Sequence, residues 1–177
     1  MAKKLFWIDL EMTGLDVEKE VIIEVAGIVT DMDLKPLTTY HSIVKQPQNF
    51  LDHMDEWNTA HHGASGLTAA VPNGRDPDLV EKDLIALLDE HFPSERAILA
   101  GNSISQDRLF ITKYFKKFNE RLHYRNVDVT SWKIVLNEKF KIKYYKKNTH
   151  RALDDVSESI AELQFYLSHF TSNPVVS

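Results

Sequence analysis

Strand-like segments are concentrated at the start of this chain. Residues 4–9, 21–30 and 39–44 are rich in apolar and β-branched side chains, and only short segments separate them. Connections of this length join antiparallel neighbours far more easily than parallel ones. The sequence therefore predicts a domain that opens with a three-stranded antiparallel meander.

Helix-like and strand-like segments alternate after the meander. Asp76-Pro77 is a typical helix start, with Asp at the N-cap and Pro in the first turn. The pattern predicts helices over residues 52–60, 76–91, 105–118, 130–137 and 151–170, and strands over residues 97–100 and 126–129. Thr130 or Ser131 is the expected N-cap of the fourth helix. Three strands followed by alternating helices and strands predict an α/β fold with a mixed sheet.

Length and composition limit the class of protein. The 177 residues suit one compact domain over residues 1–177, and 43% hydrophobic with 27% charged residues is ordinary globular composition. There are no cysteines, which excludes disulfides, thiolate zinc sites and cysteine nucleophiles. No apolar run has the length of a membrane span and no signal peptide is apparent, so a cytoplasmic location is expected.

The net charge of −5 limits how the chain could hold nucleic acid. Proteins that follow long nucleic acids usually carry a basic face, because phosphate contacts dominate their affinity. A nucleic-acid substrate should therefore be short and held locally, with metal ions supplying positive charge. Residues 139–147 form the one basic stretch, and a surface loop or a substrate-facing loop explains it equally well.

Asp9 and Glu11 are the first candidates for chemistry. They end an apolar strand two positions apart, so their side chains leave the same face. Paired carboxylates repel each other unless a cation lies between them, and oxygen ligands suit Mg²⁺ or Mn²⁺. The alternative is a solvated strand end with two surface acids.

Two further segments carry candidate residues. Asp107 enters a helix after a polar turn, where it could also simply favour the helix dipole. His150 and Asp155 flank the start of the last helix and could converge there on one point. His150 is a candidate general base, because its ordinary pKa lies near neutrality; the alternative is a capping or surface role. Asp154 is interpreted as a first-turn acid that serves the helix dipole.

Together these segments resemble the DEDD exonuclease family in its histidine-containing (DEDDh) branch. Asp9-x-Glu11 matches the first motif, Asp107 the second, and His150 with Asp155 the third. Within that branch the chain resembles the oligoribonucleases over nearly its whole length. The stretches that carry the resemblance are WIDLEMTGL (7–15), WNTAHH (57–62), SGL (65–67), GNSISQD (101–107), HYR (123–125) with Asp128, and THRALDD (149–155).

The resemblance implies a fold and a mechanism. The fold would be ribonuclease-H-like, with a mixed five-stranded sheet flanked by helices. Two divalent metal ions, Mg²⁺ or Mn²⁺, would be held by Asp9, Glu11, Asp107 and Asp155. Asp9 would bridge both ions and His150 would take the proton from the attacking water. Nucleoside 5′-monophosphates would be released from the 3′ end of very short oligoribonucleotides, which completes RNA degradation.

The resemblance also implies substrate contacts, at Leu15, Trp57, His62, Ser103, Tyr124, Arg125, Thr130 and Ser131. Leu15 and Trp57 would bracket the bases. The serine, threonine, arginine and His62 side chains would cap the 5′ phosphate, which favours 5′-phosphorylated dinucleotides. Tyr124 would reach the neighbouring subunit's site in a homodimer. Family members usually have Ser-Thr where this chain has Thr130-Ser131, so both hydroxyls are retained.

Other interpretations remain open. A proofreading or RNA-trimming exonuclease of the same branch would act on longer DNA or RNA ends, but an open groove would not need Leu15, Trp57, Tyr124 and Arg125. A catalytically silent nucleotide-binding module is a different class, and retention of all five motif residues disfavours it. Trp57 could instead be a core residue. His53, His61 and His62 match no common zinc spacing.

Overall fold

A computed structural model describes residues 3–145 and 151–170 of the chain. Its five-stranded sheet has the order β3-β2-β1-β4-β5. The strands are β1 (Lys4–Met12), β2 (Ile22–Asp31), β3 (Pro36–Ile43), β4 (Ala97–Gly101) and β5 (Leu122–Asp128). β1, β2 and β3 pair antiparallel, whereas β4 runs parallel to both β1 and β5. The predicted meander and the mixed five-stranded sheet are confirmed.

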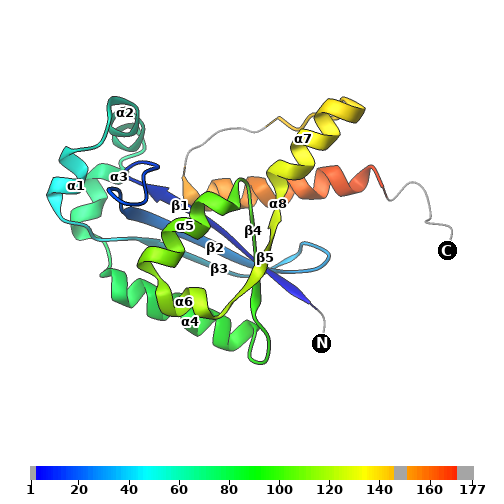
Figure 1. Ribbon diagram of the computed structural model, residues 1–177, viewed down its shortest axis with the longest axis horizontal. Helices are drawn as coiled ribbons and strands as arrows, with labels where there is room; N and C mark the ends of the chain where they lie inside the picture. The colour runs from blue at the N-terminus through cyan, green and yellow to red at the C-terminus, as the bar shows by residue number, and fades with distance from the viewer. Residues whose placement is uncertain (1–2, 146–150, 171–177) are drawn as a thin grey trace.

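Helices cover both faces of this sheet (Figure 1). They are α1 (Gln48–Asp52), α2 (Glu56–Ala64), α3 (Leu67–Ala70), the 3₁₀ turn η1 (Val71–Asn73), α4 (Pro77–His91), α5 (Ile104–Tyr114), α6 (Lys116–Glu120), α7 (Val129–Phe140) and α8 (Ala152–Ser168). α4, α5 and α6 pack on one face, and α7 with α8 on the other. Within the part of the chain that the structure describes, none of the helices is long and apolar enough to cross a membrane.

Side chains of β1 alternate between these two layers. Phe6, Ile8 and Leu10 are buried with α4, α5 and α6, whereas Leu5 and Trp7 are buried with α7 and α8. Since successive strand residues point to opposite faces, Asp9 and Glu11 continue the row of Leu5 and Trp7. The hydrophobic pattern of β1 therefore aims both acids at the α8 side of the sheet.

The central strands separate next to this row. Pairing between β1 and β4 ends at Trp7 and Ala100. A Cβ at Gly101 would lie 2.9 Å from the backbone oxygen of Ile8, so any larger residue at this position would force β4 away from β1. Past this point the edge of β1 faces α5, and its N–H groups need partners from outside the sheet.

Two predicted helices are interrupted. The helix predicted over residues 52–60 is two helices, because the chain turns at residues 53–55 and Asp55 caps α2 by accepting a hydrogen bond from the Asn58 N–H. The helix predicted over residues 105–118 breaks at Phe115, between α5 and α6. The backbone leaves the helical region at Phe115, with φ of −120° and ψ of 61°, and Phe110, Phe115 and Phe118 are all buried in one core.

The expected N-cap of α7 is wrong. Asp128, rather than Thr130 or Ser131, is the N-cap, and its side chain accepts a hydrogen bond from the Thr130 N–H at 2.9 Å. β5 also begins earlier than predicted, at Leu122, and runs directly into this cap. The Thr130 hydroxyl therefore forms other contacts.

Candidate active site

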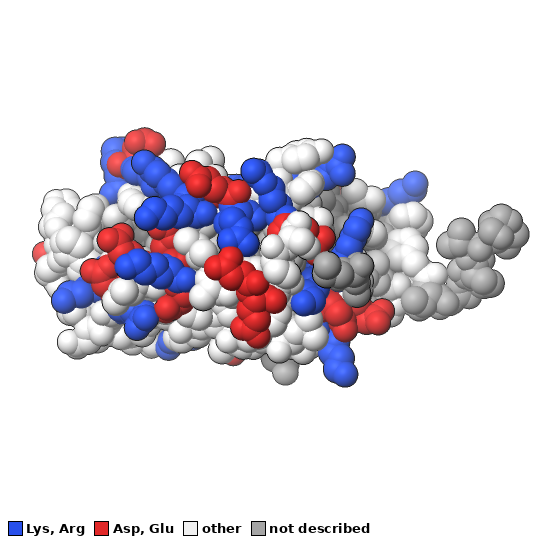
Figure 2. All heavy atoms as spheres, turned by 90° about the horizontal axis from the view of Figure 1, so that it is seen from below, with Lys and Arg blue, Asp and Glu red and all other residues white. Residues whose placement is uncertain are grey.

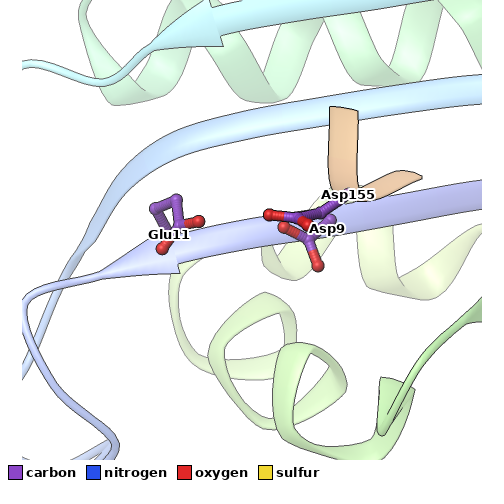
Figure 3. A group of neighbouring side chains, drawn as sticks. All are labelled: Asp9, Glu11 and Asp155. Atoms are coloured by element: carbon purple, nitrogen blue, oxygen red, sulfur yellow. The ribbon is translucent and has the colours of Figure 1, made fainter. Parts of the chain in front are cut away.

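Three carboxylates converge where β1 passes the start of α8. Asp9 and Glu11 come from β1 and Asp155 from the first turn of α8. Figure 3 shows the carboxylates of Asp9 and Asp155 next to each other, with Glu11 further along the strand. One oxygen from each residue lies within 4.8 Å of the others. A cluster of this composition suits a hard divalent cation such as Mg²⁺ or Mn²⁺.

The electrostatics of the cluster favour a bound cation. Burial raises the pKa of Glu11 to about 8, and the negative charges of Asp155, Glu24 and Asp107 add to the effect. Arg151 opposes this rise only in part. Acidic groups therefore surround Glu11 without enough positive charge to balance them, and a divalent ion would supply that charge. The donor set thus fits the metal that the sequence predicts.

Asp107 is held slightly apart from this cluster. It lies in the first turn of α5, is 6% exposed, and its Oδ1 accepts a hydrogen bond from the Leu10 N–H at 3.0 Å. Burial raises the pKa of Asp107 to about 7, against the lowering effect of its backbone hydrogen bonds. The structure thus groups three of the four predicted metal ligands and anchors the fourth to the strand residue between Asp9 and Glu11.

Leu15 and Trp57 present apolar surface to solvent near the end of β1. Their exposed fractions are 73% and 64%, so the alternative of a core role for Trp57 is wrong. The indole of Trp57 stacks on the His61 ring with centroids 4.4 Å apart. The Leu15 backbone oxygen accepts a hydrogen bond from Gln106 Nε2 at 2.9 Å. Gln106 was not predicted, although its place beside Asp107 is the signal that could have found it.

His62 is placed differently from these two. It is buried on α2, and its Nε2 lies 2.9 Å from the Met12 backbone oxygen. Burial lowers the pKa of His62. A neutral imidazole in this place joins α2 to the end of β1.

Ser103 and Thr130 lie in direct contact. The Ser103 N–H donates to Thr130 Oγ1 at 2.9 Å and to Asp128 Oδ1 at 3.0 Å, and the two hydroxyl oxygens are 3.2 Å apart. Ser103 adopts a left-handed backbone conformation with φ of 50°. Ser131 follows on the exposed side of α7. These contacts gather the predicted hydroxyls at the carboxyl ends of β4 and β5.

Arg125 and Tyr124 form a separate pair on β5. The guanidinium carbon lies 5.1 Å from the centre of the Tyr124 ring, and Tyr124 is 73% exposed on the edge strand. Arg125 also lines a pocket with Lys3, Lys4 and Arg96. Among the described residues, no hydrogen bond or ion pair joins Arg125 to Ser103 or Thr130.

His150 lies outside the described residues. The neighbouring Asp154 is exposed in the first turn of α8, as predicted for an acid that serves the helix dipole. Within the basic stretch at 139–147, Lys139 and Phe140 belong to the end of α7, and residues 141–145 have no regular secondary structure.

Comparison with known proteins places the chain in a family. A model of the exonuclease family RNase T matches residues 6–163. Mitochondrial oligoribonuclease from Homo sapiens is 44% identical over 172 residues, covering 94% of this chain and 73% of the human protein. Oligoribonuclease from Pseudomonas aeruginosa is 45% identical over 177 residues, covering 95% of this chain and 96% of that protein. The chain belongs to the oligoribonuclease family of exonucleases. The resemblance found in the sequence is confirmed, and with it the class of enzyme, a metal-dependent 3′→5′ exoribonuclease.

Solved structures support the fold of this oligoribonuclease family member. Exonuclease I of E. coli in complex with a 5cy-dT13 oligonucleotide superposes with a TM-score of 0.72 at 12% identity, over 97% of this chain. The zinc-bound form of the exonuclease I–ssDNA complex gives 0.75 at 14% identity, over 96% of this chain. The chain spans about two fifths of these larger proteins, 42% and 41% of their lengths. The ribonuclease-H-like exonuclease fold is confirmed.

Proposed function

We propose that this chain hydrolyses very short oligoribonucleotides from the 3′ end, prefers 5′-phosphorylated dinucleotides, and releases nucleoside 5′-monophosphates. The observation that carries the proposal is the carboxylate cluster of Asp9, Glu11 and Asp155, together with Leu15, exposed four residues past Glu11, and the exposed Trp57. Metal-binding chemistry and base-stacking surface are thus combined on β1 and the elements that follow it. The reaction would be the last step of RNA degradation.

Two Mg²⁺ or Mn²⁺ ions are the proposed cofactors. Asp9, Glu11 and Asp155 would hold them with support from Asp107, which fits the raised pKa of Glu11 and the buried carboxylate of Asp107. Bound ions of this kind lower the pKa of a coordinated water and neutralise charge that develops on the phosphate. The proposed task of the four acids is to keep oxygen ligands fixed on both sides of the scissile phosphate.

His150 is the proposed general base. The support is its sequence position, five residues before Asp155 and directly before Arg151 at the start of α8. A histidine with an ordinary pKa near neutrality accepts a proton from water at physiological pH and releases it to solvent afterwards.

Substrate length is proposed to be limited at both ends. Leu15 and Trp57 would bracket the bases, since an aromatic face stacks on any base. Ser103, Thr130, Ser131 and Arg125 are the proposed cap of the 5′ phosphate, and His62 would join it only if its buried Nε2 leaves the Met12 backbone oxygen. The contact between Ser103 and Thr130 supports this placement, and Arg125 would complete the cap only if the assembly brings it there. Figure 2 shows Lys and Arg among Asp and Glu side chains over one face, which suits a short substrate better than a long strand.

A homodimer is the proposed functional unit, with Tyr124 reaching the neighbouring subunit's site. Two features support a surface for a second copy. Tyr124 is exposed on edge strand β5, and an apolar groove on α7 and the end of α8 is lined by Trp132, Val135, Leu136, Phe140 and Phe170 together with Ser131. Exposed apolar patches of this kind mark interaction sites. The cytoplasm is the proposed location.

The test is a time course with Mn²⁺ or Mg²⁺ on 5′-phosphorylated oligoribonucleotides from two residues upward. We expect the dinucleotide to be hydrolysed fastest, and an Asp9→Ala variant to be inactive. Faster initial rates on longer oligomers would favour the RNA-trimming alternative. Dinucleotide binding without metal-dependent hydrolysis would instead favour a nucleotide-binding module.

A further inference from the structure

A buried carboxylate outside the predicted motifs lies behind the metal cluster. Glu24 is on β2, directly across the β1–β2 ladder from Glu11, and its side chain is fully buried. A buried charge in this position must be neutralised by partners. Two side chains contact its Oε1: the His41 imidazole of β3 through Nε2 at 2.6 Å, and the Arg151 guanidinium through Nη2 at 2.9 Å.

The contacts of Glu24 fix the start of α8. Arg151 is the N-cap of that helix and donates to Glu24 Oε1 from Nε at 3.2 Å as well as from Nη2. The first helical residue, Ala152, directs its N–H at Glu24 Oε2 at 3.4 Å. The Arg151 side chain itself does not cap the helix. Glu24 thus supplies from the sheet the acceptor that helix N-termini usually receive from their own N-cap.

The same helical turn carries a metal-ligand candidate. The Asp155 N–H donates to the Arg151 backbone oxygen at 3.0 Å, so any shift of Arg151 is passed to Asp155 by one hydrogen bond. Arg151 Nη1 also lies 3.5 Å from the backbone oxygen of Ser65, at the end of the helix that carries Trp57. A continuous series of contacts therefore runs from Glu24 through Arg151 to the metal cluster.

We propose that Glu24 is a positioning residue for the metal site: through Arg151 and the first turn of α8, it sets where Asp155 stands relative to Asp9 and Glu11. Glu24 and Arg151 would act as one unit, because the two donors of a single guanidinium converge on a single carboxylate. This inference rests on the proposed function only in taking the carboxylate cluster as a metal site.

The test is Mn²⁺ binding measured directly, without substrate, on folded protein well below its unfolding temperature. Glu24→Gln keeps the side-chain shape and removes the charge, whereas Arg151→Lys keeps the charge and removes the paired donors. We expect either change to weaken Mn²⁺ binding about 10-fold or more, the usual effect of losing an outer partner of a metal ligand. The variant with both changes should bind Mn²⁺ no more weakly than the single variant with the lower affinity, since both changes break the same contact.

His41→Gln is the matched control. It removes the other partner of the same carboxylate, but His41 lies on β3 and is not part of α8. We expect lower stability with Mn²⁺ affinity close to that of the unchanged protein. If Glu24→Gln does not fold, the Mn²⁺ affinities of Arg151→Lys and His41→Gln can still be compared.

Two outcomes would overturn the inference: unchanged Mn²⁺ affinity in Arg151→Lys, or an equal loss of affinity in His41→Gln. Different outcomes would contradict the proposed function and the positioning role. Protein that binds Mn²⁺ but leaves a 5′-phosphorylated dinucleotide intact would contradict that function alone. Full hydrolytic activity with unchanged Mn²⁺ affinity in the Arg151 variant would contradict the positioning role alone.

Discussion

The Asp107 carboxylate accepts a hydrogen bond from the backbone N–H of Leu10, and Leu10 is the residue between Asp9 and Glu11. This contact forms just past the point where β1 and β4 separate. It gives a strand N–H its partner and brings a fourth carboxylate to the edge of the cluster. Asp107 therefore combines a structural role with its proposed role in holding metal.

Asp107 variants should separate these two roles. Asp107→Asn keeps an oxygen acceptor for Leu10 and removes the charge, so we expect near-normal stability and greatly reduced turnover. Asp107→Ala leaves the Leu10 N–H unsatisfied and should also lower the free energy of unfolding by about 1–3 kcal/mol. Denaturant unfolding of metal-free protein, alongside initial hydrolysis rates, checks both. Equal stability of the Ala and Asn variants would show that the Leu10 contact contributes nothing.

Local pattern predicted part of this site and could not predict the rest. The two-residue period of a strand is enough to place Asp9 and Glu11 on one face. The contact of Asp107 with Leu10 joins residues 97 positions apart, and that of Glu24 with Arg151 joins residues 127 apart. Neither contact produces a pattern in the local sequence from which it could be predicted. The break at Phe115 was also missed, because the apolar residues from 104 to 118 keep a helical period across it.

Metal binding should depend on pH. Burial and neighbouring acids raise the pKa of Glu11 from 4.5 to about 8 in the metal-free protein. Between these values the folded protein holds a proton that the unfolded chain has lost, so the stability of the metal-free protein falls as pH rises through this range. A metal ion must displace the same proton. We therefore expect Mn²⁺ affinity to increase between about pH 6 and pH 8, with proton release.

Calorimetry in buffers of different ionisation enthalpy would measure that proton release. Glu11→Gln is the control, because it has no titrating group at this position. Its Mn²⁺ affinity should be lower and its dependence on pH flatter. If the variant releases the same number of protons, the titrating group is not Glu11. Asp107 would then be the next candidate, because burial raises its pKa to about 7.

Leu15→Ala and Trp57→Ala should weaken substrate binding without harming the fold. Both side chains are mostly exposed, so truncation removes little buried area. Loss of one base–aromatic stacking contact costs about 1–3 kcal/mol, which predicts a KM for the dinucleotide roughly 5- to 150-fold higher in Trp57→Ala. Leu15→Ala removes an apolar contact rather than a stacked ring and should change KM in the same direction. Leu79→Ala, an exposed apolar residue on α4, is the matched control and should leave KM unchanged. An unchanged KM in the Trp57 variant would exclude stacking at this residue.

His150→Ala should reduce turnover while sparing binding. A general base contributes about 10²-fold or more to rate, and its removal does not take away a proposed metal ligand. We expect Mn²⁺ affinity and dinucleotide affinity within a few-fold of normal. Single-turnover kinetics at saturating metal isolates the hydrolysis step. Near-normal turnover would remove His150 from the mechanism, and a large loss of Mn²⁺ affinity would assign it to metal binding instead.

The proposed contribution of Tyr124 across a dimer can be tested by mixing two inactive variants. Tyr124→Ala should lose turnover without losing its own carboxylate cluster, because its side chain is exposed on an edge strand. Asp9→Ala should lose its own site but retain Tyr124. In a symmetric dimer, subunits exchanged at equal concentration would form mixed dimers with one complete site each.

Random exchange places about half of the protein in mixed dimers, so roughly a quarter of all sites should regain activity. If Tyr124 acted in the site of its own subunit, one subunit of a mixed dimer would lack Tyr124 and the other would lack Asp9. No site would then be complete, and mixing would not restore activity. Trp132→Glu is the control for assembly. A charge buried in the apolar groove should prevent dimer formation, and sedimentation should then detect monomers. Restored activity that disappears when both variants also carry Trp132→Glu would tie the Tyr124 contribution to that groove.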